Sequence, residues 1–329
     1  MDKKLVVIGS NSFSGASFIG HTLDQGYEVI GISRSNENID ALLPYKWTDN
    51  KNYRFKQFDL NLHTQEIVHL IKESESPYII NFAAQAMVAE SWENPSHWYQ
   101  TNVVANVRLH DELRKIDSIK KYVHISTPEV YGSCEGVVEE NDRFNPSTPY
   151  ATSRAACDMH LMNFYQTYKF PVVFTRAANV YGPGQQLYRI IPRTILYIKL
   201  GKKLQLHGGG HSLRSFIHIN DVADGTLKVA LEATPPDTFH FSTDQHISIR
   251  KLVELICEKM GADFKKLVEV SEDRPGKDAA YLLGTDKAEK ELNWSAKTSL
   301  EQGIEETISW IDKYIEILQD MPLGYIHKR

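Results

Sequence analysis

The sequence predicts an α/β protein built on a doubly wound parallel sheet, with a smaller α/β region toward its C-terminal end. Short β-branched runs alternate with longer amphipathic stretches over the first half of the chain, which indicates strand–helix–strand units. Most of the expected strands are apolar through much of their length, as is typical of strands covered on both faces. A glycine-containing turn directly follows the first strand. Because right-handed crossovers are favoured, these observations predict a Rossmann-type strand order.

The expected elements follow one another in a regular order. Strands are expected at residues 5–8, 28–32, 54–58, 78–82, 121–125 and 171–175. Helices are expected between them at residues 15–25, 64–73, 95–116 and 150–168. After Ala177 the sequence becomes rich in turn residues, and helical patterns return at residues 248–260, 286–292 and 300–314, the first with Ser248 as N-cap. We therefore expect one domain over residues 1–177, with a return near residues 216–243, and a second region over residues 178–329.

Composition and charge limit the classes of partner. The chain has 329 residues, a hydrophobic fraction of 42% and a net charge of -5, which give no sign of nucleic-acid or membrane-surface binding. Its cysteines, Cys134, Cys157 and Cys257, match no metal-ligand spacing, and we interpret them as reduced thiols. No apolar run reaches the roughly 18–20 residues of a membrane span. We expect a cytoplasmic protein without a bound metal.

The turn after the first strand has the features of a dinucleotide site. Gly9 directly follows the strand and Gly15 lies at the start of a helix, whose N–H groups and positive dipole end favour a pyrophosphate. Gly9 permits the tight turn, and Gly15 permits close helix–strand packing. Ser12 stands where the middle glycine is usually found, so the backbone is expected to approach the cofactor differently. The pattern predicts a bound dinucleotide, with a merely structural glycine-rich turn as the alternative.

The end of the second strand bears on the choice of cofactor. NAD enzymes tend to carry an acid there for the ribose hydroxyls, whereas this chain has Ser33 and Arg34, and a cation suits a 2′-phosphate. We therefore favour NADP over NAD, although Arg34 could equally be a solvated surface arginine. After the third strand, Asp59 is a candidate for contact with the adenine. Residues 83–85, after the fourth strand, include small side chains where the backbone passes close to the cofactor.

Residues suited to acid–base chemistry follow the fifth strand. Thr127 lies just after it, and Tyr150 and Arg154 are four residues apart on the next expected helix, where they share a face. A cation beside a phenol lowers its pKa and helps it act as a base, and Thr127 can hold the same substrate oxygen by a hydrogen bond. This assembly would remove a hydroxyl proton while hydride leaves to a nicotinamide. On spacing alone, an ordinary amphipathic helix that carries a tyrosine and an arginine is the better explanation.

The chain resembles the extended short-chain dehydrogenases/reductases, the group of nucleotide-sugar epimerases and dehydratases. Tyr150 and Arg154 are similar to the Tyr-x-x-x-Lys pair of that group. Further segments fit the family pattern in order along the chain, at residues 81–85, 101–102, 126–132, 176–183, 214–222, 273–278, 292–294 and 304–310. The resemblance implies a nucleotide-diphosphate sugar as substrate. It also implies a homodimer in which the helices at 95–116 and 150–168 pair as a four-helix bundle, unless their apolar residues face only the sheet.

Glu129 is the residue that bears on the reaction. In sugar-nucleotide 4,6-dehydratases a glutamate at this position removes the C5 proton once the C4 hydroxyl has been oxidised to a ketone, which acidifies the C5–H bond. Loss of the C6 hydroxyl and return of hydride to C6 then give a 4-keto-6-deoxy sugar. Related decarboxylases also carry the glutamate, simple 4-epimerases usually lack it, and a solvated loop carboxylate is the structural alternative. We expect a 4,6-dehydratase, with an epimerase or decarboxylase and a non-catalytic dinucleotide-binding protein as alternatives.

The predicted site can be given residue by residue. The expected catalytic residues are Thr127, Glu129, Tyr150 and Arg154. The expected dinucleotide contacts are Gly9, Ser12, Phe13, Ser14, Gly15, Ser33, Arg34, Asp59, Leu60, Ala83, Ala84, Gln85 and Asn102, together with Tyr150 and Arg154. For the substrate, the resemblance implies contacts from Glu129, Asn179, Arg214 and Arg274. Arg189 and Arg193 are weaker candidates, because either can be a solvated helix charge.

The chain also departs from the family pattern. Ser12 replaces a glycine, Pro128 an aspartate, Met87 a common histidine and Arg154 the lysine. Because Pro128 removes the acid otherwise available to the leaving hydroxyl, Glu129 would serve both steps. Arg154 keeps the charge of the lysine but is bulkier and spreads that charge over a wider group, which puts turnover in question.

Overall fold

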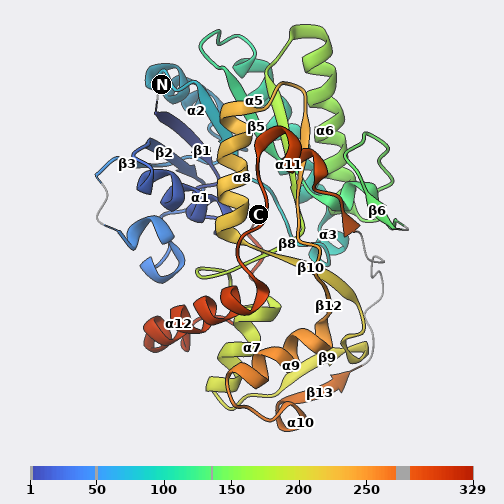
Figure 1. Ribbon diagram of the computed structural model, residues 1–329. Coiled ribbons are helices and arrows are strands. Elements are labelled where there is room, and N and C mark those ends of the chain that lie inside the picture. The colour runs from blue at the N-terminus through green and yellow to red at the C-terminus, as the bar shows by residue number, and fades with distance from the viewer. Residues whose placement is uncertain (1–2, 49–50, 135, 272–281, 329) are drawn as a thin grey trace.

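Seven parallel strands form the main sheet (Figure 1). The computed structural model describes residues 3–48, 51–134, 136–271 and 282–328. The strands are β1 (Lys4–Ile8), β2 (Glu28–Ser33), β3 (Tyr53–Gln57), β4 (Tyr78–Asn81), β5 (Lys121–Ile125), β7 (Val172–Ala177) and β11 (Thr238–Phe241). Their order in space is β3-β2-β1-β4-β5-β7-β11, and every neighbouring pair is parallel. The order changes direction between β1 and β4, which is where open α/β sheets form a crevice for ligands.

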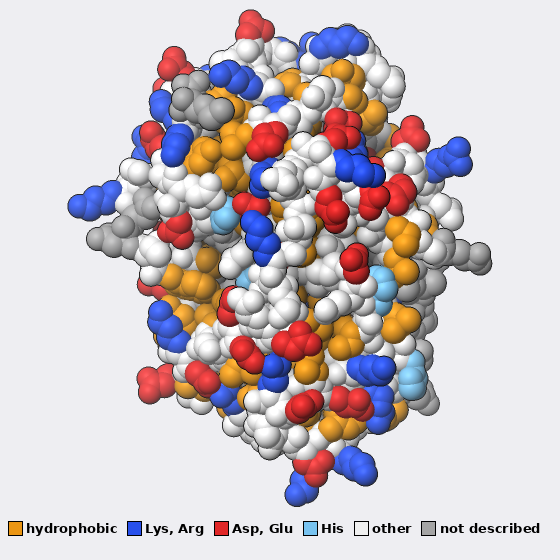
Figure 2. All heavy atoms as spheres, in the orientation of Figure 1, with side chains coloured by type: hydrophobic (Ala, Val, Ile, Leu, Met, Phe, Trp, Pro, Cys, Tyr) orange, Lys and Arg blue, Asp and Glu red, His pale blue; other side chains and the backbone are white. Residues whose placement is uncertain are grey.

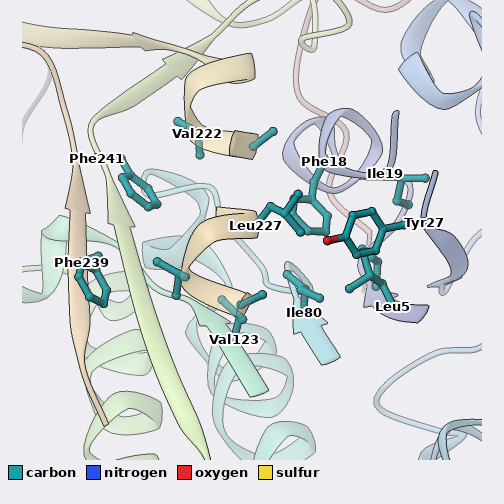
Figure 3. Close-up of a cluster of buried hydrophobic side chains, with 14 of the residues drawn as sticks. Leu5, Phe18, Ile19, Tyr27, Ile80, Val123, Val222, Leu227, Phe239 and Phe241 are labelled. Atoms are coloured by element: carbon teal, nitrogen blue, oxygen red, sulfur yellow. The ribbon is translucent and has the colours of Figure 1, made fainter. Parts of the chain in front are cut away.

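Helices cover both faces of this sheet. They are α1 (Phe13–Asp24), α2 (Thr64–Ser74), α5 (Asn106–Leu113), α6 (Pro149–Tyr168) and α8 (Ile219–Glu232). On one face, Phe18 of α1 and Leu227 of α8 share a buried cluster with Leu5, Ile80 and Val123 of the strands (Figure 3). On the other face, side chains of α2, α5 and α6 form a second buried cluster with alternate residues of the same strands. The doubly wound Rossmann-type fold predicted from the sequence is therefore confirmed.

A second, smaller region lies beyond the carboxyl ends of the main strands, in the lower part of Figure 1. Its strands are β8 (Asn179–Tyr181), β9 (Leu204–His207), β10 (Leu213–His218), β12 (His246–Ser248) and β13 (Val268–Ser271), and its helices are α7 (Ile190–Lys199), α9 (Ile249–Lys259), α10 (Phe264–Leu267) and α12 (Leu300–Leu318). β8, β10 and β12 form one small sheet, and β9 pairs with β13. This region has its own apolar core, in which α7, α9 and α12 bury Ile195, Leu252 and Ile311.

The remaining elements are short. They are α3 (Glu90–Glu93), α4 (Pro95–Tyr99), α11 (Asp286–Leu292), the strands β6 (Val137–Val138) and β14 (Leu282–Leu283), the π-helix η3 (Gln100–Ala105), and the 3-10 turns η1 (Asp40–Leu42), η2 (Pro44–Lys46), η4 (Pro128–Tyr131) and η5 (Gly208–Gly210). The helix expected at 95–116 is present as α4, η3 and α5, which follow one another without a gap and contain a π-turn in the middle. Such wide turns often occur at functional sites.

Most of the expected elements are present within one or two residues of their predicted bounds. Ser248 caps α9 as predicted, its hydroxyl accepting a hydrogen bond from the amide of Lys251 at 3.1 Å. Among the helices of ten or more residues, α7 and α8 were not predicted, and neither were the short helices α3 and α10. Through α8 and β11 the chain comes back from the second region to the main sheet, where β11 pairs with the edge of β7.

The helices and the surface of the described residues can be compared with those of membrane proteins. Within residues 3–48, 51–134, 136–271 and 282–328, no helix is both long and apolar enough to cross a bilayer. Figure 2 shows acidic and basic side chains interspersed over the face in view. A surface of that kind is ordinary for a globular domain and offers no broad single-sign field on that face.

Candidate active site

A cavity of about 740 Å³ opens at the carboxyl ends of β1, β2 and β4. Its wall includes most of the residues predicted for the dinucleotide, namely Gly9, Ser12, Ser33, Arg34, Asp59, Leu60, Ala83, Ala84 and Gln85. Phe13, Ser14 and Gly15 form the first turn of α1, next to Ser12. Asn102, Tyr150 and Arg154 lie outside this wall. The predicted residues thus gather at one hollow, at the position where Rossmann-type sheets bind ligands.

The turn between β1 and α1 leaves room for an anion against its backbone. Gly9 has a φ of +89°, and a Cβ there would lie 2.7 Å from the amide nitrogen of Ala83. A Cβ on Gly15 would lie 2.3 Å from the carbonyl oxygen of Gly9. Both glycines are therefore required by close approach, as predicted from the sequence. Because the backbone comes so close at both glycines, the turn is tight and the N-terminus of α1 faces the cavity. This arrangement fits a dinucleotide pyrophosphate.

Ser12 has a defined role in place of the missing glycine. It is the N-cap of α1: its Oγ accepts from the amide of Gly15 at 3.0 Å and donates to the carbonyl of Gly9 at 2.7 Å. An N-cap serine satisfies one of the amides at the start of the helix and stabilises the turn by about 1 kcal/mol. With serine in place of the usual glycine, the turn is therefore held by two hydrogen bonds of the Ser12 side chain.

The loop after β2 is shaped by Asn11, which was not among the predicted contacts. Asn11 donates through Nδ2 to the carbonyls of Ser35 and Asn36 at 3.0 and 2.9 Å. This holds the loop carrying Arg34 against the phosphate-binding turn. On the neighbouring strand end, Asp59 folds its own turn, because its Oδ1 accepts from the amide of Asn61 at 2.7 Å. Asn11 gave no signal in the sequence beyond its place inside the turn.

A chain of hydrogen bonds joins the cavity wall to α6. Asn102, at the π-turn, accepts from the amide of Gln85 at 2.8 Å and donates to its carbonyl at 3.0 Å. The same side chain amide donates to Ser153 at 2.9 Å, and Ser153 donates to the carbonyl of Tyr150 at 2.7 Å. Asn102 is fully buried. It therefore fixes Gln85 relative to α6 and is not part of the cavity wall, so a direct contact of Asn102 with the dinucleotide stays a prediction.

Thr127, Glu129 and Tyr150 meet at the start of α6. Thr127 caps the turn η4, and its hydroxyl accepts from the amide of Glu129 at 3.3 Å. Tyr150 is hydrogen-bonded to the Thr127 side chain and lies within electrostatic range of Glu129. Pro128 occupies the first position of η4, where the absent N–H of proline is tolerated. The substitution of Pro128 for an acid is therefore compatible with the turn that presents Glu129.

The pKa of Tyr150 corrects part of the prediction made from the sequence. Burial is the largest effect and raises the pKa of this phenol, and the nearby Glu129 carboxylate raises it further. Arg154, the hydrogen bond from Thr127 and Arg189 act in the opposite direction. The predicted influence of Arg154 thus has the expected sign, but it is smaller than the effect of burial. Arg189, a weaker candidate in the sequence, is a cation that reaches this phenol electrostatically.

Arg154 is buried and bound to the end of β5. Its guanidinium donates to the carbonyl of Ile125 and lies 3.1 Å from Nε2 of His124. Only 2% of the residue is exposed. Burial and the two neighbouring arginines hold the pKa of His124 well below its usual range, so the ring is neutral and accepts through Nε2. An arginine is longer than a lysine and has a planar fork of donors, which explains how it reaches the strand end.

A buried ion pair lies next to the contact between α6 and the end of β5. Asp158 lies one helical turn after Arg154 and pairs with Arg176 of β7 at 2.8 Å, while accepting from Ser126 at 2.7 Å. Both charged side chains are at most 2% exposed. The four-residue spacing from Tyr150 to Arg154 to Asp158 is visible in the sequence and could have indicated one functional face. Asp158, the third member of this series, was not among the predicted site residues.

The residues predicted to bind the substrate are only partly placed. Asn179 at the start of β8 donates to the carbonyl of Ser215 at 3.1 Å and pairs in register with Phe216 of β10, two residues along that strand from Arg214. Arg274 lies outside the described residues. Arg193 binds the hydroxyl of Tyr197 at 3.1 Å within α7, which is a structural contact. Asn179 and Arg214 therefore lie on neighbouring strands, and their contact with the substrate stays a prediction.

No metal centre is found among the residues that the structure describes. In that part of the chain, no group of three or more His, Cys, Asp or Glu side chains is arranged to hold an ion. The three cysteines, Cys134, Cys157 and Cys257, are free thiols.

Comparisons with known proteins agree with this geometry. The family model described as GDP-mannose 4,6 dehydratase matches residues 6–307. The chain is 29% identical to the human dTDP-D-glucose 4,6-dehydratase over 322 residues, covering 94% of this chain and 89% of the human protein. It is 26% identical to the Escherichia coli dTDP-glucose 4,6-dehydratase over 339 residues, covering 93% of each protein.

Solved structures lead to the same group. The dTDP-glucose 4,6-dehydratase of Bacillus anthracis in complex with NAD superposes with a TM-score of 0.85 and 29% identity, covering 95% of this chain and 98% of that one. DesIV, the dTDP-glucose 4,6-dehydratase of Streptomyces venezuelae with NAD and TYD bound, superposes with a TM-score of 0.87 and 28% identity, covering 94% of this chain and 97% of that one. The UDP-glucose 4-epimerase of Thermotoga maritima superposes with a TM-score of 0.86 and 24% identity, which shows that it shares the fold. The chain therefore belongs to the GDP-mannose 4,6-dehydratase family, among the nucleotide-sugar 4,6-dehydratases of the extended short-chain dehydrogenases/reductases.

Proposed function

We propose that this chain is a nucleotide-diphosphate-sugar 4,6-dehydratase, a lyase that acts with a bound nicotinamide dinucleotide. The observation that carries the proposal is the meeting of Thr127, Glu129 and Tyr150 at the start of α6. Hydrogen bonds through Asn102 and Ser153 join this place to Gln85 in the wall of the dinucleotide cavity. A phenol held by a hydroxyl suits the oxidation step, and a carboxylate next to them suits the proton removal that distinguishes a dehydratase. The two dTDP-glucose 4,6-dehydratases that superpose on the chain support the same assignment.

The oxidation half of the reaction falls to Thr127 and Tyr150. Tyr150 takes the proton of the C4 hydroxyl, and Thr127 holds that oxygen by a hydrogen bond. A nicotinamide dinucleotide held by the cavity wall would supply the hydride acceptor for the oxidation at C4 and the hydride donor for the later reduction at C6. Arg154 acts on Tyr150 through its charge, since it lowers the pKa of the phenol against the effect of burial.

The elimination half falls to Glu129. The C4 ketone acidifies the C5–H bond, and the Glu129 carboxylate removes this proton. The carboxylic acid so formed can then donate a proton to the departing C6 hydroxyl, which leaves as water. One residue can serve both steps because the second step needs the proton that the first step delivers. This agrees with Pro128, which leaves position 128 without an acid.

The sugar nucleotide is proposed to enter from the second region. Asn179 and Arg214 lie on the neighbouring strands β8 and β10 and are proposed to bind the diphosphate. Arg189, which acts electrostatically on Tyr150, is proposed as a further cation for the same ligand. In this arrangement, residues 1–177 with the return through α8 and β11 hold the dinucleotide, and residues 178–329 mainly hold the substrate.

Mass spectrometry of a panel of nucleotide sugars incubated with the purified protein tests the proposed reaction. A dehydratase releases a product lighter by one water. Loss of carbon dioxide would identify a decarboxylase instead. A product of unchanged mass but altered configuration would identify an epimerase, and bound dinucleotide without any turnover would favour a non-catalytic binding protein.

The choice between NADP and NAD is proposed to depend on Arg34. This residue follows β2 and lies in the cavity wall, where a cation suits a 2′-phosphate. The relatives from Bacillus anthracis and Streptomyces venezuelae were solved with NAD. The preference for NADP therefore rests on Arg34 and remains a prediction.

We expect Arg34→Ala to weaken NADP binding much more than NAD binding. A lost charge-assisted contact corresponds to about 1.5–3 kcal/mol, or roughly 10- to 150-fold in affinity. Isothermal titration calorimetry with each dinucleotide measures the difference, and Arg34→Lys, which keeps the charge, is the matched control. Equal losses for the two dinucleotides would refute a 2′-phosphate contact.

A homodimer is proposed through the helices on the outer side of the sheet. Large apolar side chains on these helices are exposed, with Tyr99 at 38%, Val104 at 38%, Met159 at 51% and Tyr168 at 50%. They belong to α4, η3 and α6, which pack side by side. Exposed apolar groups gathered on neighbouring helices are typical of an interaction surface. We expect a dimeric mass in light scattering at micromolar concentration, and a monomeric mass would contradict the proposal.

The cytoplasmic location remains a prediction from the sequence.

A further inference from the structure

The segment after α12 leaves the second region and reaches the dinucleotide cavity. Lys328 belongs to the cavity wall, together with Gly9, Arg34 and Gln85 from the opposite end of the chain. The residues that carry the segment to this place are 325–328.

Contacts from both sides of the cavity hold the end of this segment. The carbonyl oxygen of Lys328 accepts from Nε2 of Gln85 at 2.7 Å and from the guanidinium of Arg34 at 3.3 Å. Arg34 follows β2 and Gln85 follows β4, on either side of the turn after β1. One backbone carbonyl is therefore bound by residues from both sides of the turn after β1, so Lys328 links the two sides of the cavity wall.

Aromatic contacts hold two residues that precede Lys328. The ring of His327 stacks on those of His97 and Trp98, with centroids 5.1 and 5.3 Å apart and planes inclined by 6° and 9°. Its Nε2 lies 2.8 Å from Nδ1 of His97. Tyr325 packs edge-on against Tyr188 at 5.6 Å. The segment thus joins α4, the loop before α7 and the dinucleotide cavity.

The charges of the cavity indicate what the segment does there. Among the described residues of its wall, the cations are Arg34 and Lys328, and the acids are Glu37 and Asp59. Glu37 already has an opposite charge nearby, since Lys46 lies 3.5 Å away. A dinucleotide brings a diphosphate with two negative charges into this cavity. Arg34 is proposed to bind the 2′-phosphate, so Lys328 is the described cation of the wall that is left to balance the diphosphate.

We propose that residues 325–328 form a strap across the dinucleotide site and that Lys328 binds the cofactor, its ammonium group pairing with the diphosphate. The inference rests on the proposed function only in taking a nicotinamide dinucleotide as the ligand. The strap faces the phosphate-binding turn, so that the pyrophosphate lies between the N-terminus of α1 and Lys328. A strap in this place slows release of the dinucleotide, which suits a reaction that returns its hydride before product leaves.

Dinucleotide binding in the absence of any sugar nucleotide tests this strap. We compare the full chain, a chain ending at Gly324, and Lys328→Glu by isothermal titration calorimetry with NAD and with NADP. The matched control is Lys202→Glu, which makes the same charge change at an exposed lysine between α7 and β9. The shorter chain and Lys328→Glu are each expected to bind about tenfold more weakly or worse, and the control is expected to bind normally. The loss for Lys328→Glu is expected to shrink as salt is raised.

Two results would overturn the proposal. Unchanged affinity in both variants would make the segment ordinary surface packing. Tighter binding by the shorter chain would make it a plug that competes with the dinucleotide. If the shorter chain fails to fold, as judged by its thermal melt, Lys328→Glu decides, because it changes one exposed side chain. Tail-dependent binding without turnover would overturn the proposed function and leave the strap in place.

Limited proteolysis of the unmodified chain gives an independent measurement. Chymotrypsin cleaves after aromatic residues, and Tyr325 lies in the proposed strap. Saturating dinucleotide is expected to slow cleavage at Tyr325, because the diphosphate holds Lys328 and the segment before it. Cleavage that is equally fast or faster with dinucleotide would contradict the strap.

Discussion

Arg154→Ala is expected to lower turnover at neutral pH by about a hundredfold, with little change in the affinity for the sugar nucleotide. Tyr150 must be ionised to take the C4 hydroxyl proton, and Arg154 is the largest of the effects that lower its pKa against burial. Removing the cation therefore raises the pKa of Tyr150 further. The limb on which activity increases with pH should move to higher pH, so that part of the lost activity returns in alkaline buffer.

Arg154→Lys is the matched variant, because it restores a cation on the same helical turn. It is expected to retain activity and the original pH profile. Because Arg154 also contacts Ile125 and His124, the melting temperature of each variant is measured beside the profile of kcat against pH. An alanine variant with unchanged rate and profile would show that Arg154 only joins α6 to β5.

The parallel sheet could be predicted because strands buried on both faces leave continuous apolar runs. α8 was missed for a local reason. Its interior contains Gly225, a poor helix former, and a Cβ there would lie 2.6 Å from the ring of Phe241. Tertiary packing of the helix on β11 thus requires a residue that weakens the helical pattern in the sequence. α7 likewise carries Pro192 near its start, among turn-rich neighbours.

The site was predictable where chemistry is tied to position in the fold. Gly9, Thr127 and Tyr150 stand at strand and helix ends that the alternating pattern locates. The net direction of the Tyr150 pKa was not predictable, because burial depends on how distant segments pack around the phenol. The strap contacts were not predictable either, since Lys328 meets Arg34 and Gln85 across almost the whole length of the chain. A local sequence pattern does not indicate contacts between residues so far apart in the chain.

Glu129→Gln is expected to separate the two halves of the reaction. Oxidation at C4 needs Tyr150, Thr127 and the cofactor, and no carboxylate takes part. Glutamine keeps the size of glutamate but does not accept the C5 proton. The variant should therefore bind the sugar nucleotide and show absorbance in the reduced nicotinamide band, while release of a 4-keto-6-deoxy product falls by about 10²–10⁴, as is typical for loss of a general base.

Hydrogen exchange at C5 makes this test specific. In deuterated water the native protein is expected to exchange the C5 hydrogen of its substrate, and Glu129→Gln is expected not to. Glu258→Gln, at an exposed carboxylate on α9, is the control and should dehydrate and exchange normally. In a 4-epimerase, Glu129→Gln would turn over nearly as well as the native protein, because that reaction never breaks the C5–H bond. Full dehydration by Glu129→Gln would mean that another residue removes the C5 proton, and the role proposed for Glu129 would be wrong.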